Sequence, residues 1–424
     1  MKIPLFVVPT LTILPVALSI PLQFVASPPD ASQLLPSNPD FTLGDVDRLL
    51  KIHPDPVELM KLLSPETAEE EDEPRLLRVF GRQAFWGTEG DKMRLRREGL
   101  GFMDLTGLSD ETEGLSLIEG KADNYTWPDL KYQDLVKAIL PRLSTSNMHS
   151  NLVHLTSFFN RFYKSPHGAE SSHWVYLQVL KIVADAPAHV PLSVRKFTHP
   201  FAQSSVIARF EAKQTNHKDK VVIIGAHQDS ANYRLPLLPA PGADDDGSGT
   251  VTILEAFKAL VESGFTPKVP VEFHWYAAEE GGLLGSKDIV KDIIASNVDV
   301  KGMIQFDMTA FTKANMTPTV TLIDTDVTTS LTQWTVKVAK TYSSIKVQLA
   351  SLFPGAGSDH MSYYQAGFPS CFATEADPFV AFDPYVHTTG DRIDLPNKEF
   401  SFEHAVEFSK LAIGFAVELG GWEQ

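Results

Sequence analysis

The sequence predicts an α/β fold: a mixed, largely parallel central sheet with helices on both faces, forming one large domain. Three observations support this class. The run at 221–224 is continuously apolar, as expected for a strand that is buried on both faces of a sheet. Strands and helices alternate along the second half of the chain, which is typical of parallel sheets covered by helices. Two alternating segments, 192–197 and 204–212, come before the apolar run and predict a pair of antiparallel edge strands.

The elements follow one another with no internal repeat and no linker after residue 86. A small helical piece is predicted within 45–63. Apolar residues then recur at helical spacing; Val251, Leu254 and Phe257, for example, share one face of a helix that begins at Ser248. Further helices are predicted at 130–143, 147–162, 171–184, 283–295, 328–341, 358–365 and 399–419. Further strands are predicted at 269–278, 300–308, 320–324 and 369–374.

Composition excludes some classes of partner. The formal net charge is −16, from 37 basic and 53 acidic residues, which argues against nucleic acid or an anionic membrane surface as a partner.

The chain has 1 cysteine, Cys371, so it cannot form an intramolecular disulfide, and cysteine usage says nothing for or against secretion. Asn124 and Asn315 begin Asn-X-Thr triplets and are potential glycosylation sites.

The N-terminus resembles a secretory signal peptide, which we predict at residues 1–19. Lys2 is followed by an uncharged, mostly apolar run to Ala26, and small residues at 17–19 offer a cleavage site. Because four prolines interrupt this run, it would make a poor membrane-spanning helix, and no membrane anchor is expected. The protein is therefore expected to be secreted; a membrane anchor or a disordered tail is the alternative.

Residues 20–85 are predicted to be a removable propeptide. The segment is rich in proline and acids, and an acidic run at 69–73 is followed by arginines up to Arg82, at which a processing protease could cut. An ordered N-terminal subdomain is the alternative. Under either interpretation, the pattern of a globular domain begins at residue 86, so the main domain is predicted to span 86–424.

Metal-compatible side chains occur where predicted strands end. His227 and Asp229 follow the apolar strand, and three consecutive acids, Asp244 to Asp246, follow a Pro-Gly-Ala turn. Because sites in open α/β sheets form beyond the carboxyl ends of the strands, these groups are expected to converge. Imidazole nitrogens and carboxylate oxygens are ligands that zinc accepts. On its own, a triple aspartate would more simply cap the following helix or solvate a loop.

Three further positions supply similar groups. Glu279 and Glu280 follow one predicted strand, Asp307 follows the next, and His387 lies in a Thr-Thr-Gly-Asp loop. Adjacent glutamates on an extended chain point in opposite directions, so one can bind a metal while its neighbour faces a water molecule. Two cations that share a site need a bridging carboxylate and would stand about 3.5–4 Å apart. Either histidine, taken alone, would more simply be an ordinary surface or core residue.

Six motifs together resemble the co-catalytic zinc aminopeptidases, a family that includes secreted fungal leucine aminopeptidases and bacterial leucyl aminopeptidases. The resemblance runs from Trp86 through the final helix. It implies that residues 86–424 form a single catalytic domain with the fold of the zinc-dependent exopeptidases. In order along the chain, the motifs are GAHQDS, PGADDDGSG, YAAEEGGLLGS, QFDM, GSDH and VHTTGD.

The resemblance implies two zinc ions per chain and a glutamate general base. Glu279 would take a proton from the attacking water and pass it to the leaving amine. Asp229 would fix the tautomer of one ligand imidazole, and Asp246 and Ser358 are weaker candidates for supporting the ligands. The peptide bond between the second and third acids of the triple is expected to be cis. The ligands implied are His227 and Asp307 for one ion, Glu280 and His387 for the other, and Asp245 shared between them.

The resemblance also implies a pocket for the first side chain of the substrate. It would be built from Met308 and the segment 372–386. Within that segment, Phe379, Phe382 and Val386 would make the pocket apolar, which suits leucine-like or aromatic N-terminal residues.

One loop departs from the pattern of the family. Close relatives carry a Cys-Gly-Tyr-x-Cys loop before the Ser-Asp-His motif, which provides a disulfide and a tyrosine that helps to stabilise the oxyanion. Here the segment 352–357 has neither. Losing one such hydrogen-bond donor can lower the rate by about 10²–10³, so turnover or substrate range is expected to differ.

The function predicted is that of a secreted two-zinc aminopeptidase, acting as a monomer on peptides with a free N-terminus and preferring apolar first residues. One alternative is a single-zinc enzyme related to the glutaminyl cyclases, which share the fold. Another is a non-catalytic ectodomain that has lost its metals. The triple acid in PGADDD favours the peptidase over the cyclase, and the presence of every ligand residue argues against the ectodomain.

Overall fold

The structure is a computed structural model that describes residues 43–107, 123, 125–212 and 220–423. The predicted signal peptide and the potential glycosylation site at Asn124 lie outside the described residues. The other such site, Asn315, is exposed on a turn with φ of 65°. Within the described part of the chain, no helix is both long enough and apolar enough to cross a membrane.

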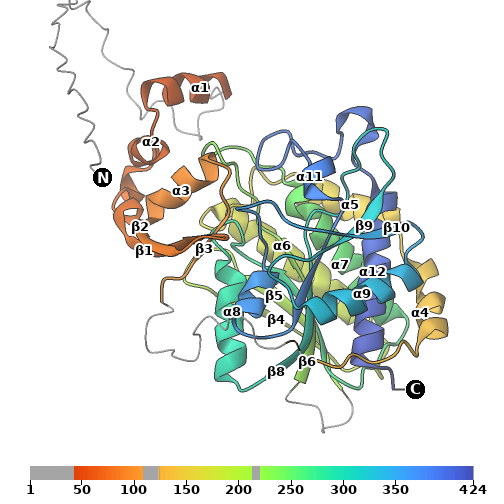
Figure 1. The fold of residues 1–424 in the computed structure, drawn as a ribbon. Helices are drawn as coiled ribbons and strands as arrows, with labels where there is room; N and C mark the ends of the chain where they lie inside the picture. The colour runs from red at the N-terminus through yellow and green to blue at the C-terminus, as the bar shows by residue number, and fades with distance from the viewer. Residues whose placement is uncertain (1–42, 108–122, 124, 213–219, 424) are drawn as a thin grey trace, which may run out of the picture.

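An eight-stranded mixed sheet forms the centre of the molecule. Its strands are β4 (Leu192–Phe197), β5 (Ser205–Phe210), β6 (Lys220–His227), β7 (Val271–Tyr276), β8 (Asp299–Phe306), β9 (Thr319–Ile323), β10 (Lys346–Ala350) and β11 (Ser370–Thr374). They lie in the order β10-β9-β11-β8-β6-β7-β5-β4 (Figure 1). The four neighbours β11, β8, β6 and β7 are parallel to one another. Antiparallel pairing appears at β9 on one side and at β5 and β4 on the other, so the predicted mixed, largely parallel sheet is confirmed.

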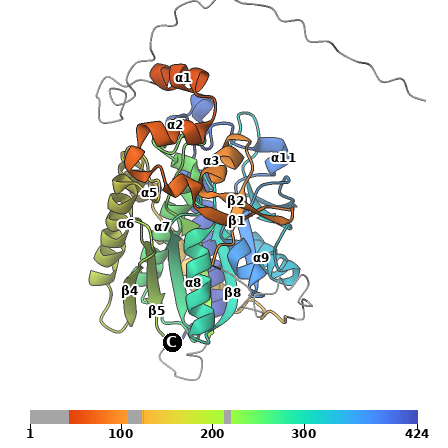
Figure 2. The ribbon, with the colours of Figure 1, turned by 90° about the vertical axis from the view of Figure 1, so that its left-hand side faces the viewer.

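Helices cover both faces of this sheet, as the fold class requires. Those after the N-terminal region are α4 (Gln133–Ile139), α5 (Thr145–Leu155), α6 (Pro166–Ala184), α7 (Gly249–Glu262), α8 (Leu284–Ala295), α9 (Thr329–Tyr342), α10 (His360–Gln365), α11 (Pro378–Ala381) and α12 (Phe402–Gly420). α8 and α10 lie on one face, with α8 in front of the sheet in Figure 2. α4 to α7, α9 and α12 contribute to the larger core on the other face.

The central strand β6 shows why its sequence is continuously apolar. Val222 and Ile224 point into the larger core, whereas Val221 and Ile223 point into the smaller core beneath α8. All four side chains are at most 1% exposed. A strand with helices on both faces has no solvent-facing side, so polar residues do not alternate with apolar residues along it.

The predicted helix at 147–162 is wrong in its second half. Helix α5 ends at Leu155, and the chain then runs irregularly beneath the loop that follows β6. Thr156 is the C-cap of the helix, and its hydroxyl donates to the carbonyl oxygen of Leu152. Arg161 is then fully buried, because its guanidinium binds backbone carbonyl oxygens of that loop. This tertiary contact, rather than the local apolar spacing, decides the course of the chain.

Residues 43–104 form a separate layer, which we call the N-terminal layer. It comprises α1 (Leu43–Ile52), α2 (Pro56–Leu63), β1 (Pro74–Val79), β2 (Ala84–Thr88), α3 (Glu89–Arg97) and β3 (Phe102–Asp104). The strands form an antiparallel sheet in the order β2-β1-β3. In Figure 2 the layer lies above one end of the central sheet. The predicted boundary between residues 85 and 86 falls inside β2. Because β1 lies between β2 and β3 in the sheet, this boundary divides the sheet of the layer.

Candidate metal centre and substrate pocket

The five predicted metal ligands lie together at the carboxyl end of the parallel strands. His227 is the last residue of β6, Asp307 follows the neighbouring β8, and Glu280 follows β7 on the other side. Asp245 comes from the turn between β6 and α7, and His387 from the loop after α11. Because β6 pairs with both β7 and β8, the chain segments that leave these three strands meet at one edge of the sheet.

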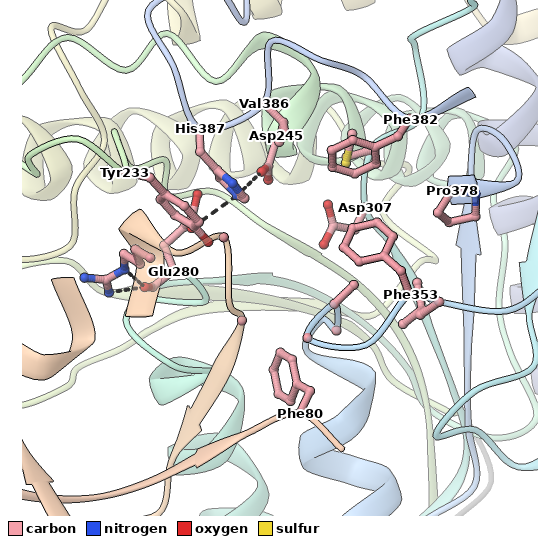
Figure 3. A pocket seen from close by; sticks show the side chains of 18 of the residues that line it. Phe80, Tyr233, Asp245, Glu280, Asp307, Phe353, Pro378, Phe382, Val386 and His387 are labelled. Carbon is pink, nitrogen blue, oxygen red and sulfur yellow. Dashed lines mark hydrogen bonds and ion pairs between the residues drawn. The ribbon is translucent and has the colours of Figure 1, made fainter. Parts of the chain in front are cut away.

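The carboxylate of Asp245 lies between the two imidazoles. Its Oδ1 is 3.0 Å from Nε2 of His227, and its Oδ2 is 2.7 Å from Nε2 of His387 (Figure 3). Each imidazole approaches a second carboxylate, since His227 Nε2 is 3.6 Å from Asp307 Oδ1 and His387 Nε2 is 3.6 Å from Glu280 Oε2. One carboxylate that approaches two histidines through its two oxygens is the arrangement required of a bridging ligand.

The ligand atoms form two groups of cation-binding size. In the first, atoms of Asp245, Glu280 and His387 all lie within 4.8 Å of one another. In the second, atoms of His227, Asp307 and Asp246 meet the same limit. Asp246, however, already accepts hydrogen bonds from the backbone N–H groups of His227, Gly249 and Met308, so its lone pairs are largely used. We therefore regard Asp246 as a brace for the turn, with Asp245 completing the second group. The peptide bond between Asp245 and Asp246 is cis, as predicted.

The electrostatics of this cluster fit bound cations. Both carboxylate oxygens of Glu280 are buried without a hydrogen-bond partner. Burial, together with the neighbouring Asp245, raises the pKa of Glu280 to about 7 despite the opposing effect of His387. Burial lowers the pKa of His387, but Glu280 and Asp245 outweigh it and raise the pKa to about 9. Crowded carboxylates therefore draw positive charge to this site, and the nitrogen and oxygen donors are those of zinc.

Two predicted supporting residues make direct contacts with the ligands. Asp229 accepts hydrogen bonds from the backbone N–H groups of Glu279 (3.0 Å) and Glu280 (3.1 Å), and its Oδ1 is 3.3 Å from Nδ1 of His227. The hydroxyl of Ser358 donates to Oδ2 of Asp307 at 2.6 Å. Both residues thus help to fix the direction of a ligand side chain.

Two residues that hold the ligand loops were missed by sequence reasoning. Asp391 accepts from the backbone N–H of Asp244 at 2.8 Å and from that of Asp245 at 3.0 Å. It ends the motif VHTTGD, so a signal was present. Arg161 donates to the carbonyl oxygens of Gln228 (2.7 Å) and Gly242 (2.8 Å), and nothing in its local sequence indicates this role.

A cavity of about 620 Å³ opens beside the metal ligands. Met308, Phe382 and Val386 line it, as predicted, and Glu279 reaches it as well. Phe379 is a correction, because it does not line the cavity and its side chain is 65% exposed. In the short helix α11, Pro378 and Ala381 share the face toward the cavity, which turns position 379 outward; Phe382 follows the helix in an extended conformation.

The N-terminal layer supplies part of the cavity wall, which the sequence did not predict. Phe80 and Phe102 line the cavity beside Phe353 of the loop 352–357. The backbone N–H of Gly101 donates to the carbonyl oxygen of Gly355 at 2.7 Å, which ties the layer to that loop. A Cβ atom at position 101 would lie 2.4 Å from the same oxygen, so this approach requires glycine.

The layer also contacts a metal-ligand residue directly. The guanidinium of Arg96, on α3, is buried, and its Nε donates to the backbone carbonyl oxygen of Glu280 at 2.9 Å. Its Nη2 donates to the same oxygen. The segment that carries the two predicted glutamates is therefore held from one side by Asp229 and from the other by the N-terminal layer.

The fold and the site define a metallopeptidase-like centre: two groups of side chains that could hold a metal at one edge of the sheet, a nearby glutamate and an apolar cavity. Comparison with known proteins specifies the family. The model of peptidase family M28 matches residues 205–408. Leucine aminopeptidase 1 of Coccidioides posadasii is 40% identical over 355 residues, 81% of this chain and 88% of that protein. The enzyme of that name from Aspergillus clavatus is 40% identical over 360 residues, 82% of this chain and 90% of that protein.

A solved structure agrees with these relatives. Legionella pneumophila LapA aminopeptidase superposes with a TM-score of 0.70 at 26% identity, covering 83% of this chain and 99% of the other. The chain belongs to peptidase family M28, and it is a zinc-dependent aminopeptidase. The resemblance found in the six sequence motifs is therefore confirmed.

Proposed function

We propose that the chain removes leucine-like or other apolar residues from the N-termini of peptides, using two zinc ions and Glu279 as general base. The observation that carries this proposal is the position of Asp245, with one carboxylate oxygen 3.0 Å from His227 and the other 2.7 Å from His387. A bridging carboxylate between two imidazoles is expected for two cations rather than one.

These distances support the ligand assignment that the resemblance implies. One ion would be held by His227 and Asp307, and the other by Glu280 and His387. Asp245 would bind both ions. When bound, zinc would polarise the scissile carbonyl and lower the pKa of the attacking water.

The remaining chemistry belongs to the side chains of the chain itself. Glu279 lines the cavity, and burial raises the pKa of its carboxyl group well above the usual range, with Glu280 adding to the effect. It would take the proton of the attacking water and deliver it to the leaving nitrogen. Asp229 would hold the backbone of both glutamates and orient His227, and Ser358 would orient Asp307.

The preference for apolar first residues is supported by the cavity and by the relatives. Met308, Phe382 and Val386 give one side of the cavity an apolar surface. The relatives at 40% identity bear the name leucine aminopeptidase 1. These relatives also favour the peptidase over a glutaminyl cyclase or a non-catalytic ectodomain.

Two measurements test this function. Zinc per chain is expected to be two in the wild type and lower in Asp245→Ala, measured by elemental analysis after dialysis. Kinetics on a panel of aminoacyl amides is expected to rank leucine and phenylalanine above glutamate and lysine, and a chelator should abolish turnover. One zinc per chain in the active enzyme, or conversion of an N-terminal glutamine peptide to a cyclic product, would contradict the proposal.

Secretion, the propeptide and the monomeric state remain part of the same proposal. Removal of residues 20–85 would take β1 out of its sheet and Phe80 out of the cavity wall. Sequencing the N-terminus of the protein recovered from culture medium tests the signal peptide and the cleavage site together. Mass analysis of the same sample tests whether Asn124 and Asn315 carry glycans, and light scattering tests the monomer.

A further inference from the structure

The cavity has two unlike walls on either side of the metal ligands. One wall is apolar and contains Phe353 and Phe382, and it is where the first side chain of the substrate is expected to lie. The cavity is also lined by Tyr233, Arg97 and Arg234, which have no assigned role and which together we call the polar wall. Figure 3 shows Tyr233 beside His387 and Glu280, across the cavity from Phe353 and Phe382.

Tyr233 is held firmly against one metal-ligand residue. Its backbone N–H donates to the carbonyl oxygen of His387 at 3.0 Å. Its ring stacks on that imidazole with the ring centroids 3.6 Å apart and the planes inclined by 10°. Its hydroxyl, in contrast, forms no hydrogen bond within the described part of the chain. A fixed ring whose hydroxyl has no partner in a substrate cavity presents a donor to a ligand.

The state of that hydroxyl supports its use as a donor. A phenol has an ordinary pKa of about 10. The phenol therefore stays protonated at neutral pH.

The two arginines give this wall a positive charge in a protein whose net charge is −16. Arg97 ends α3 and is exposed, with Nη1 donating to the carbonyl oxygen of Pro54 at 2.7 Å. Arg234 directly follows Tyr233 and is exposed as well. Arg96 does not belong to this wall in function, because its guanidinium is committed to the carbonyl oxygen of Glu280. A guanidinium is planar and offers paired N–H donors that match a carboxylate.

We propose that the wall formed by Tyr233, Arg97 and Arg234 binds the part of the peptide that follows the scissile bond and favours a carboxylate there. The proposal rests on the aminopeptidase function above. If the first side chain occupies the apolar wall, the rest of the peptide has to extend along the opposite wall. The Tyr233 hydroxyl would donate to a peptide carbonyl oxygen, and the arginines would attract either the C-terminal carboxylate of a short peptide or an acidic side chain.

The charge part of the proposal is tested with three matched substrates: Leu-Gly-Gly, Leu-Gly-Gly amide and Leu-Gly-Asp amide. The first carries a terminal carboxylate, the second none, and the third only a side-chain carboxylate. In the zinc-loaded wild type, KM is expected to be about threefold lower for a carboxylate-bearing substrate than for Leu-Gly-Gly amide, with similar kcat. The advantage should vanish in about 1 M salt, where the Debye length is about 3 Å.

A lower KM for Leu-Gly-Gly would show that the wall recognises the C-terminal carboxylate of a peptide. A lower KM for Leu-Gly-Asp amide would show that it recognises an acidic side chain. The double variant Arg97→Gln/Arg234→Gln should lose the advantage. Arg142→Gln, which removes an exposed arginine outside the cavity, should keep it. Equal KM values for all three substrates in the wild type would overturn the proposal.

The Tyr233 part is tested by Tyr233→Phe on two substrates. KM for Leu-Gly-Gly amide should rise several-fold more than KM for leucine amide, which has no residue after the scissile bond. An equal loss on both substrates, or a loss of zinc, would mean that Tyr233 only supports His387.

Binding provides a readout that does not depend on turnover. Calorimetric titration of the chelator-treated protein with Leu-Gly-Gly should show weaker binding to the double arginine variant than to the wild type. If none of the peptides is hydrolysed by the zinc-loaded enzyme, the aminopeptidase function fails, while the binding difference still decides the role of the wall. Equal affinity of the double variant and the wild type in this titration would overturn that role.

Discussion

The N-terminal layer and the central sheet are stabilised by different interactions. The central sheet buries a large apolar cluster on one face and a smaller one on the other. The layer has only small apolar clusters, and its helix α3 is anchored by buried charges. Lys92 is 1% exposed and pairs with Glu89 at 2.9 Å and Asp104 at 2.7 Å, and the hydroxyl of Tyr163 donates to Glu89 at 3.0 Å.

The contact between these two regions passes through the active site. Arg96 of the layer binds the carbonyl oxygen of Glu280, and Gly101 binds the loop 352–357. In close relatives that loop is expected to be closed by a disulfide, which this chain cannot form. Here a backbone hydrogen bond from the layer restrains it instead. We conclude that a part of the cavity, together with the backbone of Glu280, depends on the ionic anchoring of the layer, whereas the strands that carry His227 and precede Asp307 depend on the apolar sheet.

The largest effect is expected from Glu279→Gln, because this residue lines the cavity beside the sheet and is the proposed general base. Loss of a positioned general base should lower kcat by about 10²–10⁴. Neither the zinc content nor the unfolding midpoint should change, because the Glu279 side chain forms no hydrogen bond in the described structure. Glu262→Gln on the surface of α7 is the control and should retain full activity. Retained activity in Glu279→Gln would exclude it as the base.

The next effect tests the anchoring of the layer. Lys92→Met removes the fully buried cation that pairs with Glu89 and Asp104 and leaves them only the more exposed Arg75 and Lys164, and breaking a buried ion pair costs about 3–5 kcal/mol. Limited proteolysis within residues 43–104 should accelerate while the central sheet stays resistant. The matched control is Lys61→Met, whose partner Asp72 has a side chain that is 70% exposed, so it should cost less than about 1 kcal/mol. Equal effects of the two variants would show that the buried charges do not anchor the layer.

Acid should loosen the layer before it unfolds the sheet. Burial alone would raise the pKa values of Glu89 and Asp104, but Lys92 and its basic neighbours hold both below their usual range. A carboxyl group with a lowered pKa in the folded state stabilises that state above its unfolded pKa, about 3.9–4.3, and the stabilisation is lost as the pH falls through the folded pKa. The β1 amides should therefore lose protection against hydrogen exchange below about pH 4, when their rates are compared with the intrinsic exchange rate at the same pH. The amides of β8 serve as the internal reference. If the β8 amides lose protection at the same pH as the β1 amides, the layer does not loosen before the sheet.

The smallest effect concerns the start of α3. Thr88 caps this helix: its backbone N–H donates to Asp91 at 2.8 Å, and its hydroxyl accepts from the Asp91 backbone N–H at 3.3 Å. Thr88→Ala should cost about 1 kcal/mol of stability in the layer, measured by denaturant unfolding. Thr341→Ala, near the end of α9 in the main domain, should stay within about 0.5 kcal/mol. If Thr88→Ala lowers the free energy of unfolding by no more than Thr341→Ala does, the cap is dispensable.

The sequence by itself determined the fold class and the set of residues that meet at the metal centre. Hydrophobic periodicity is a local property, and the apolar run of β6 directly reflects its burial on both faces. His227, Glu280 and Asp307 follow strands, so the topology of a parallel sheet already brings them to one edge. Asp245 and His387 lie on loops, and they could be placed only through the resemblance of their motifs.

Only the tertiary structure decided which side chains complete the site around those ligands. Arg161, Arg96, Tyr233 and Phe80 act through contacts with residues far away in the sequence, and no local pattern encodes such contacts. Phe379 was misplaced because the orientation of a four-residue helix depends on packing rather than on periodicity. The division has a physical reason: strand ends are positioned by short-range patterns, whereas cavity walls are formed by segments that meet only after the chain has folded.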